Sequence, residues 1–284
     1  MLKTFRQCQR ILILLVFPLL IAACTTSIMY RNLDWLIPWY VDGMVDISRV
    51  QKAELRERLE PLLQWHREEE LQRYLDLLDQ LDSDLQARLT SDQVISWVEA
   101  ATDAVMRVES RLLDLAIEFG GEMSDEQIRE FADGLWEKQE ELEQEYLPRT
   151  DQEYIEESFT YFSDFTRRQL GRLTPEQEDR FRRAANSLIR FDSAWLQDRR
   201  TWLERISPLM ERPPGWQMSL RDAYDNREAM QSDSYRRIWE HNLEVISEAM
   251  VDVLNGRIPR QSEQLTKEIG KWRSRLERLI EENE

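Results

Sequence analysis

Apolar residues recur at intervals of three and four along most of this chain, which is the spacing of one face of an α-helix. The clearest run lies between Val94 and Phe119, and Gly120 and Gly121 follow it as a typical helix end. The same spacing predicts helices over the ranges 48–89, 94–119, 128–146, 155–165, 181–206, 220–255 and 265–279. We therefore predict an all-α protein of about seven helices, arranged as antiparallel hairpins in a bundle or an elongated helical stack.

Prolines and glycines mark the expected interruptions. Pro61 predicts a kink or split near Glu60 in the first helix, because proline lacks the amide hydrogen that a helical residue donates. The segment 207–218, reading SPLMERPPGWQM, is the strongest loop prediction, and the preceding helix is expected to close before Pro208. Trp216 lies in this loop and is a candidate for an outward contact, whereas most other tryptophans fall within helical runs and are expected to fill the core.

A short motif begins several helices: an apolar residue, serine or threonine, two further residues, and glutamine. In a capping box the hydroxyl accepts a hydrogen bond from the third helical amide, and the glutamine side chain bonds back to the cap amide. The starts are separated by 42, 34 and 50 residues, which disfavours a regular solenoid. A fifth box uses Thr150 and Glu153. The four glutamine boxes are Ser48 with Gln51, Thr90 with Gln93, Ser124 with Gln127, and Thr174 with Gln177.

The first 23 residues have the pattern of a secretory signal peptide. Three basic residues precede an apolar run of 11 residues from Ile11 to Ile21, which is too short to cross a bilayer. The sequence LIAAC that follows resembles the lipobox of bacterial lipoproteins. This resemblance implies removal of residues 1–23 and attachment of about three acyl chains, such as palmitate, at Cys24. Thr25 and Thr26 stand where an aspartate would signal inner-membrane retention, which implies the periplasmic side of the outer membrane.

Residues 24–47 form an aromatic N-terminal arm ahead of a single helical domain over 48–284. The arm reads YRNLDWLIPWYVDGMVD from residue 30, and Pro38 and Gly43 interrupt any long helix there. Two placements are open: Trp35 and Trp39 lie in the lipid headgroup layer beside the anchor, or the arm packs back onto the helical body. The LDW, WY and acidic pattern resembles a family of uncharacterised Gram-negative lipoproteins, a domain of unknown function that brings no known activity.

Charge and cysteine content narrow the possible partners. The formal net charge of −17 becomes −20 once the signal peptide is removed, because that segment carries three cations and no acid. Such a polyanion argues against nucleic acid as a partner and against direct adsorption to anionic headgroups. We expect a membrane contact through the lipid anchor and a protein partner in the periplasm, and the sequence specifies no oligomeric state. Removal of Cys8 and lipidation of Cys24 leave no thiol, so the fold rests on its core.

The complete LTxxQ form of the cap motif occurs at Leu89 and at Leu173. It resembles the signature of the Spy and CpxP family of small periplasmic helical chaperones, in which the motif also begins helices. This resemblance implies binding of unfolded clients or of a sensor kinase. The chain departs from that family in its greater length, its acidic charge and its lipid anchor.

Candidate catalytic and metal-binding patterns are weak. His66 and His241 each begin a His-x-x-Glu pattern, whereas a di-iron site in a helical bundle uses Glu-x-x-His, so we expect no metal and no cofactor. Glu157 and Ser158 resemble the pair that opens the lytic transglycosylase motif, but the glycine-rich segment expected after it is absent. No nucleophile motif such as G-x-S-x-G is present either. We expect no catalytic residues and no enzymatic activity.

These patterns together predict an outer-membrane lipoprotein that acts as a binding or scaffolding protein in the periplasm. The first alternative is a Spy-like client-binding chaperone or envelope-stress adaptor, which a concave apolar face between helical hairpins would favour. The second alternative is a cell-wall enzyme, which a cleft focused on one carboxylate with a raised pKa would favour.

Overall fold

The computed structural model describes residues 30–281. These residues form helices joined by turns and loops, and none of them lies in a strand, so the prediction of an all-α fold is confirmed. The expected signal peptide over 1–23 and the expected lipidation site at Cys24 lie outside the described residues.

The helices follow one another with short connections. Helix α4, a five-residue π-helical turn and α5 form one rod, and counting this rod once gives ten α-helices in the described part of the chain, more than the expected seven. The elements are α3 (Leu33–Asp42), α4 (Arg49–Trp65), the π turn η2 (His66–Glu70), α5 (Leu71–Asp84), α6 (Ser91–Glu122), α7 (Asp125–Tyr146), α8 (Asp151–Leu170), α9 (Pro175–Ser187), α10 (Asp192–Met210), α11 (Trp216–Asp225), the 3-10 turn η3 (Glu228–Met230), α12 (Asp233–Asn255) and α13 (Pro259–Glu281).

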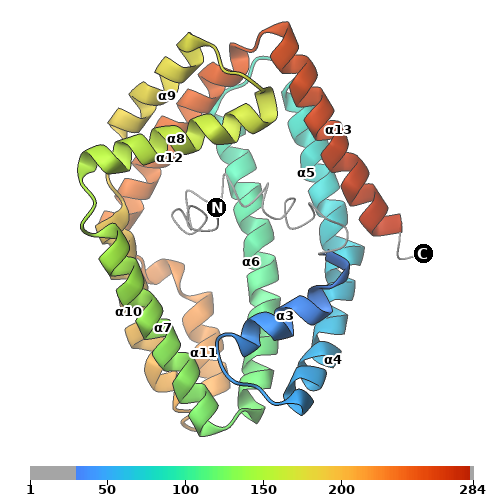
Figure 1. Ribbon diagram of the computed structural model, residues 1–284, viewed down its shortest axis with the longest axis vertical. Helices are drawn as coiled ribbons and strands as arrows, with labels where there is room; N and C mark the ends of the chain where they lie inside the picture. The colour runs from blue at the N-terminus through green and yellow to red at the C-terminus, as the bar shows by residue number, and fades with distance from the viewer. Residues whose placement is uncertain (1–29, 282–284) are drawn as a thin grey trace.

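Helix α6 runs along the long axis of the molecule, with helical hairpins on either side of it (Figure 1). The α4–α5 rod lies on one side, and α13 packs antiparallel against α5. On the other side α7 pairs with α10, while α8 and α9 close one end of the molecule. Helix α12 packs on α6 and α9, and α3 crosses the rod at α4. This arrangement is the elongated stack of hairpins that the sequence predicts.

Three apolar clusters hold the hairpins together. The largest lies between α5, α6, α8, α9, α12 and α13 and contains the fully buried rings of Tyr74 and Phe181. A second cluster lies under α3 and includes Leu55 and Phe119, and a third joins α7, α10 and α12 around Trp195. Burial of each large apolar side chain contributes on the order of 1.5–3 kcal/mol, so these clusters supply the main stabilisation of residues 30–281, a range that contains no cysteine.

The split expected near Glu60 does not occur, because Pro61 lies inside a continuous α4. Pro61 and Glu57, the residue whose carbonyl loses a helical partner, are both exposed, so water can satisfy that carbonyl. The rod instead changes its winding at His66–Glu70, where one π-helical turn separates α4 from α5. An extra residue in a helical turn of this kind shifts the side chains that follow relative to those that precede it.

The helix expected over 181–206 is divided, because α9 ends at Ser187 and α10 begins at Asp192. The side chain of Asn242 on α12 satisfies the backbone in the gap: its Oδ1 accepts from the Ile189 amide at 2.9 Å, and its Nδ2 donates to the Ile189 carbonyl at 2.8 Å. This contact comes from a residue 53 positions away, so local periodicity could not reveal the break.

The boundaries around the expected loop over 207–218 also differ. Helix α10 includes Pro208 and continues to Met210, and α11 begins at Trp216, so the loop itself covers only residues 211–215. The helix expected over 220–255 divides between α11 and α12. Ser232 begins α12 as an N-cap, with its side chain accepting from the Tyr235 amide, which is a boundary signal that the apolar spacing masks.

Candidate functional site

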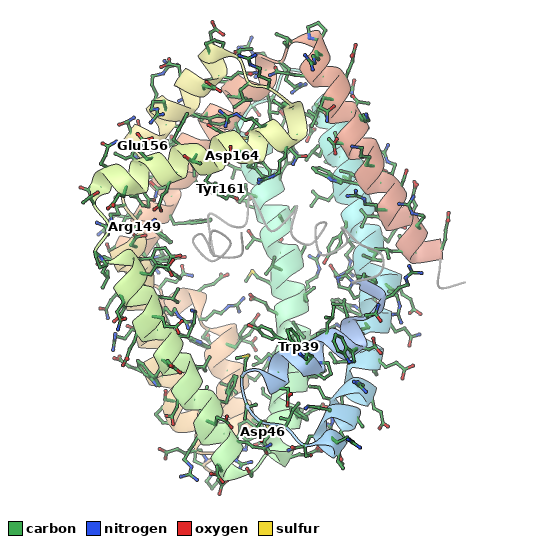
Figure 2. The ribbon with its side chains drawn as sticks, viewed as in Figure 1. Trp39, Asp46, Arg149, Glu156, Tyr161 and Asp164 are labelled. Carbon is green, nitrogen blue, oxygen red and sulfur yellow. The ribbon has the colours of Figure 1, made fainter. Side chains whose placement is uncertain are left out.

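Helix α3 exposes an aromatic face at the N-terminal edge of the described chain. Trp35 and Trp39 are separated by one helical turn, and their rings stack 6.3 Å apart at an interplanar angle of 11°. Trp35, Trp39 and Tyr40 are 50%, 62% and 61% exposed. Figure 2 labels Trp39 on α3, on the side of the helix toward the centre of the view. Large aromatic side chains that are left in water at such fractions mark a contact surface more often than a packing position.

The opposite face of α3 packs onto the helical body. Leu33, Ile37 and Val41 contact the apolar cluster that α4, α6 and α7 share. Lys52 on α4 forms an ion pair with Asp42 at 2.7 Å and lowers the pKa of that carboxyl. The arm therefore packs on the body and at the same time presents aromatic side chains to its surroundings, so the two placements left open by the sequence are compatible.

Capping boxes form at all four glutamine motifs and at Thr150 with Glu153. Two of them are hydrogen-bonded to each other, although they lie 76 residues apart in the sequence. Gln51 Nε2 donates to Gln127 Oε1 at 3.0 Å, and Gln127 Nε2 also donates to the carbonyl of Asp46 at 2.8 Å. The side chains that cap α4 and α7 thus link the starts of both helices, one at Ser48 and the other at Ser124.

The remaining glutamine boxes make similar links. Gln177 Nε2 donates to Gln261 Oε1 at 3.0 Å, and Gln261 Nε2 donates to Gln177 Oε1 at 2.8 Å. Both side chains are almost fully buried, at 4% and 1% exposure. Gln93, in the box begun by Thr90, donates to Asp84 at the end of α5 at 3.2 Å. These glutamine side chains form hydrogen bonds between helix ends, so the cap motifs connect helices as well as begin them.

Trp216 is partly buried rather than fully exposed. Its six-membered ring lies 3.8–3.9 Å from where a Cβ on Gly120 or Gly121 would stand, so these glycines allow α11 to approach α6 closely. Helix α6 continues through both glycines to Glu122, and the expected stop at that pair is wrong. Packing of the indole on α6 accounts for a tryptophan in this position.

The π turn contains His66, which is partly buried, and Glu70, which is fully buried. His66 is held between two tyrosine hydroxyls, with Tyr30 Oη 2.9 Å from Nδ1 and Tyr74 Oη 3.3 Å from Nε2. Burial lowers the pKa of His66 to about 4, so the ring is neutral at pH 7. Between residues 30 and 281 no group of three or more potential ligands is placed to hold a metal ion, and His241 bonds to the Ser187 carbonyl instead.

Glu70 ends the π turn and its side chain is fully buried. Arg107 on α6 binds it through two hydrogen bonds of 2.7 and 2.9 Å, and Arg73 pairs with the same carboxylate. Burial alone would raise the pKa of Glu70, but the two guanidinium groups outweigh it and hold the pKa below its usual range. The buried carboxylate is therefore charged and serves to join the rod to α6.

Ion pairs and helix caps hold several carboxylates in their charged form. Glu157, from the pair that resembles the transglycosylase motif, forms an ion pair with Arg149. The pKa values of five carboxylates are lowered, namely those of Asp42, Glu70, Glu143, Glu153 and Glu176. Lysine or arginine side chains lower the first three, and hydrogen bonds at the starts of α8 and α9 lower the last two.

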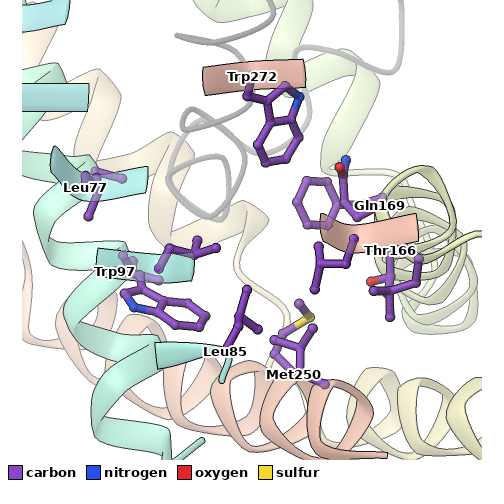
Figure 3. Close-up of a pocket in the computed structure, with 14 residues that line it drawn as sticks. Leu77, Leu85, Trp97, Thr166, Gln169, Met250 and Trp272 are labelled. Atoms are coloured by element: carbon purple, nitrogen blue, oxygen red, sulfur yellow. The ribbon is translucent and has the colours of Figure 1, made fainter. Parts of the chain in front are cut away.

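An apolar cavity of about 110 Å³ opens within the largest cluster (Figure 3). Trp97 from α6 and Trp272 from α13 line two of its sides, and Met250 from α12 lines a third. Thr166 on α8 is 2% exposed, and its hydroxyl finds no hydrogen-bond partner among the residues from 30 to 281. A cavity of this size and lining is suited to a small apolar group.

The comparisons with known proteins give a single result. Residues 43–236 match a family of unknown function, DUF6279. The chain belongs to this family. The resemblance to an uncharacterised domain that the sequence indicated is thereby confirmed. No curated protein and no solved structure matches the chain.

The DUF6279 match covers α4 to the first residues of α12. It contains the π turn and all five capping boxes, whereas the aromatic face of α3 lies before it and α13 lies after it. The apolar cavity combines residues inside the match with Met250 and Trp272 outside it. Among the helices of residues 30–281, none is both long and apolar enough to span a bilayer.

Proposed function

We propose that this DUF6279 protein is a lipid-anchored binding or scaffolding protein of the Gram-negative envelope, held on the periplasmic side of the outer membrane through Cys24. The observation that carries the proposal is the exposed aromatic face of α3, which follows the lipobox-like sequence after only a few residues. An anchored protein has reason to keep such a face beside its anchor, since tryptophan and tyrosine favour the membrane–water interface.

The length of the connection limits where α3 can lie. Leu33, the first residue of α3, comes nine residues after Cys24, and a fully extended chain spans at most about 3.5 Å per residue, or roughly 30 Å in total. A lipid attached at Cys24 therefore keeps the start of α3 close to the headgroups. The buried side of α3 transmits this placement to α4 and the rod, so the body is presented to a periplasmic partner in a limited range of orientations.

Metabolic labelling and fractionation test the anchor. We expect the wild-type chain to incorporate labelled palmitate and to sediment with outer membranes, and Cys24→Ala to lose both properties. Crosslinking of the anchored protein in intact cells is expected to yield a defined protein partner. Palmitate label in Cys24→Ala equal to that of the wild type, or wild-type protein recovered entirely in the soluble fraction, contradicts the proposal.

Quenching of tryptophan fluorescence tests the orientation. The lipidated protein in vesicles that contain phospholipids brominated near the headgroup is expected to show quenching, and the double variant Trp35→Ser, Trp39→Ser is expected to lose most of it. Met218→Ser is the matched control, because Met218 is 70% exposed but lies on α11. Equal quenching in the wild type and the double variant would place the aromatic face away from the membrane.

The same aromatic face favours one alternative, a client-binding chaperone of the Spy type, because exposed aromatic side chains also hold unfolded chains. Suppression of client aggregation at near-stoichiometric amounts, lost in the Trp35, Trp39 double variant and absent from an acidic helical control protein, would put this alternative first. We expect no suppression beyond that of the control.

A further inference from the structure

A cleft of about 520 Å³ lies between α6, α10, α11 and the start of α12. Helix α11 packs on both α10 and α6 and closes one side of it (Figure 1). Apolar and aromatic side chains make up much of the lining, including Leu113, Trp195, Trp202 and Met230. The lining residues all fall between Glu109 and Tyr235, within the part of the chain that matches the family. Clefts of this volume hold small organic ligands in many proteins.

Arg199 is the charged group that sets this cleft apart. Trp195, Arg199 and Trp202 are spaced by four and three residues on α10, which places the guanidinium and both indoles on one face. The Nε atom of Arg199 is buried without a hydrogen-bond partner, and no described residue forms an ion pair with this side chain. Burial lowers the pKa of Arg199, which shows that its charge has lost water without gaining a carboxylate.

The acidic residues of the cleft are already engaged. Asp198 accepts a hydrogen bond from the Ser232 amide at 3.1 Å and so caps the entry to α12. Glu109 accepts from the Tyr224 hydroxyl at 3.2 Å and lies 3.7 Å from Arg227. Burial, followed by the Glu109 charge, raises the pKa of Tyr224 to about 12, so this hydroxyl remains a neutral donor.

The second arginine of the cleft differs from Arg199. Arg227 lies 3.8 Å above the ring of Tyr224 and donates to the Tyr224 carbonyl at 3.0 Å. Its charge is therefore stabilised by the protein itself. The chain has 55 acidic residues, yet none of the described ones forms an ion pair with the half-buried Arg199. An anionic ligand would supply the missing counter-charge.

We propose that this cleft binds an anionic amphiphile, with a carboxylate, sulfonate or phosphate on Arg199 and an apolar or aromatic body against Trp195 and Trp202. A guanidinium binds such anions through paired hydrogen bonds, and the bond is strongest where water is excluded. The indole rings supply the flat apolar surface for the rest of the molecule. This ligand site goes beyond the anchoring function and does not depend on lipidation of Cys24.

Two fluorescent probes of similar shape and different charge test the proposal. Anilinonaphthalene sulfonate carries one anionic group, and N-phenyl-1-naphthylamine has the same ring systems without a charge. Both are titrated into the chain from Thr25 onward, which keeps the whole described helical body. We expect the anionic probe to bind at least tenfold more tightly than the neutral one. Arg199→Met is expected to weaken the anionic probe at least tenfold and to change the neutral probe less than twofold.

Two further variants separate pairing from general effects of charge and shape. Arg205→Met removes an exposed arginine from the same helix and is expected to leave both affinities within twofold. Ala116→Phe fills the cleft from α6 and is expected to weaken both probes. Unchanged binding of the anionic probe in Arg199→Met overturns the proposal. So does an equal loss of both probes in that variant, because it would show that Arg199 shapes the cleft without pairing with the anion.

Discussion

Two buried charged groups on opposite sides of α6 have contrasting surroundings. Glu70 on the rod is fully buried and accepts two short hydrogen bonds from Arg107, with Arg73 as a second cation. Arg199 on α10 is half-buried and has no ionic partner among the described residues. A buried charge that the protein compensates joins two helices, whereas one that it leaves uncompensated costs stability. The comparison distinguishes structural ion pairs from a ligand site.

The largest expected effect comes from breaking the compensated charge. Arg107→Met removes the two-bond partner of Glu70 and leaves the carboxylate buried beside Arg73 alone. We expect a loss of about 3 kcal/mol in the free energy of unfolding, measured by urea denaturation. The double variant Glu70→Gln, Arg107→Met is expected to recover at least half of that loss, because it removes the buried charge as well. A loss below about 0.5 kcal/mol in the single variant would show that the Glu70–Arg107 pair contributes no more than an exposed ion pair. The difference between Glu70 and Arg199 would then not hold.

His66 provides an intermediate effect that depends on pH. Its pKa is about 4 in the folded protein and about 6.5 in an unfolded chain. Between these values the unfolded state binds a proton that the folded state does not, so stability falls as the pH is lowered from 6.5 to 4. Because the ring is only partly buried, we expect His66 to contribute about 2 kcal/mol to this fall.

The measurement compares urea unfolding at pH 7 and pH 4.5. The difference between the wild type and His66→Gln isolates the contribution of this ring, since glutamine keeps a donor and an acceptor but does not titrate. An identical slope in the wild type and His66→Gln would contradict the buried neutral ring.

The smallest expected effect has the opposite sign. Arg199→Met removes a partly desolvated charge that has no partner, and the new side chain can pack against Trp195 and Trp202. We expect the free energy of unfolding to rise by about 1 kcal/mol in the absence of ligand. Thermal and urea unfolding both report this change. A loss of stability would show that the protein itself compensates Arg199, and the comparison with Glu70 would fail.

Much of the fold could be predicted from local signals. Capping boxes and apolar spacing identified the helix starts at Ser48, Thr90, Ser124 and Thr174, because each signal lies within one helical turn of the boundary that it specifies. The break after Ser187 depends on Asn242, which reaches it from another helix. Local sequence could not contain that information.

The candidate sites were predictable to different degrees. Trp35 and Trp39 were named as possible contacts because they lie in an aromatic stretch shortly after Cys24, but the sequence left open whether this arm lies in the headgroup layer or packs on the helical body. Arg199 could not be singled out, since the absence of a partner depends on which acids other helices bring close. The spacing of Trp195, Arg199 and Trp202 was a visible signal, but it is equally typical of a core face with one charged residue. The π turn also left no recognisable pattern in the sequence around His66.

The link between Gln51 and Gln127 has a consequence for how the molecule responds to its solution. Helix N-termini carry partial positive charge, and two of them placed together would repel. Here the starts of α4 and α7 are joined by amide and hydroxyl groups, which neither titrate nor attract counterions. Salt screens the ion pairs on the surface of this acidic protein, but it has little effect on a hydrogen bond between two neutral amides. The register of the two helices is therefore fixed by groups that remain the same in dilute and concentrated electrolyte.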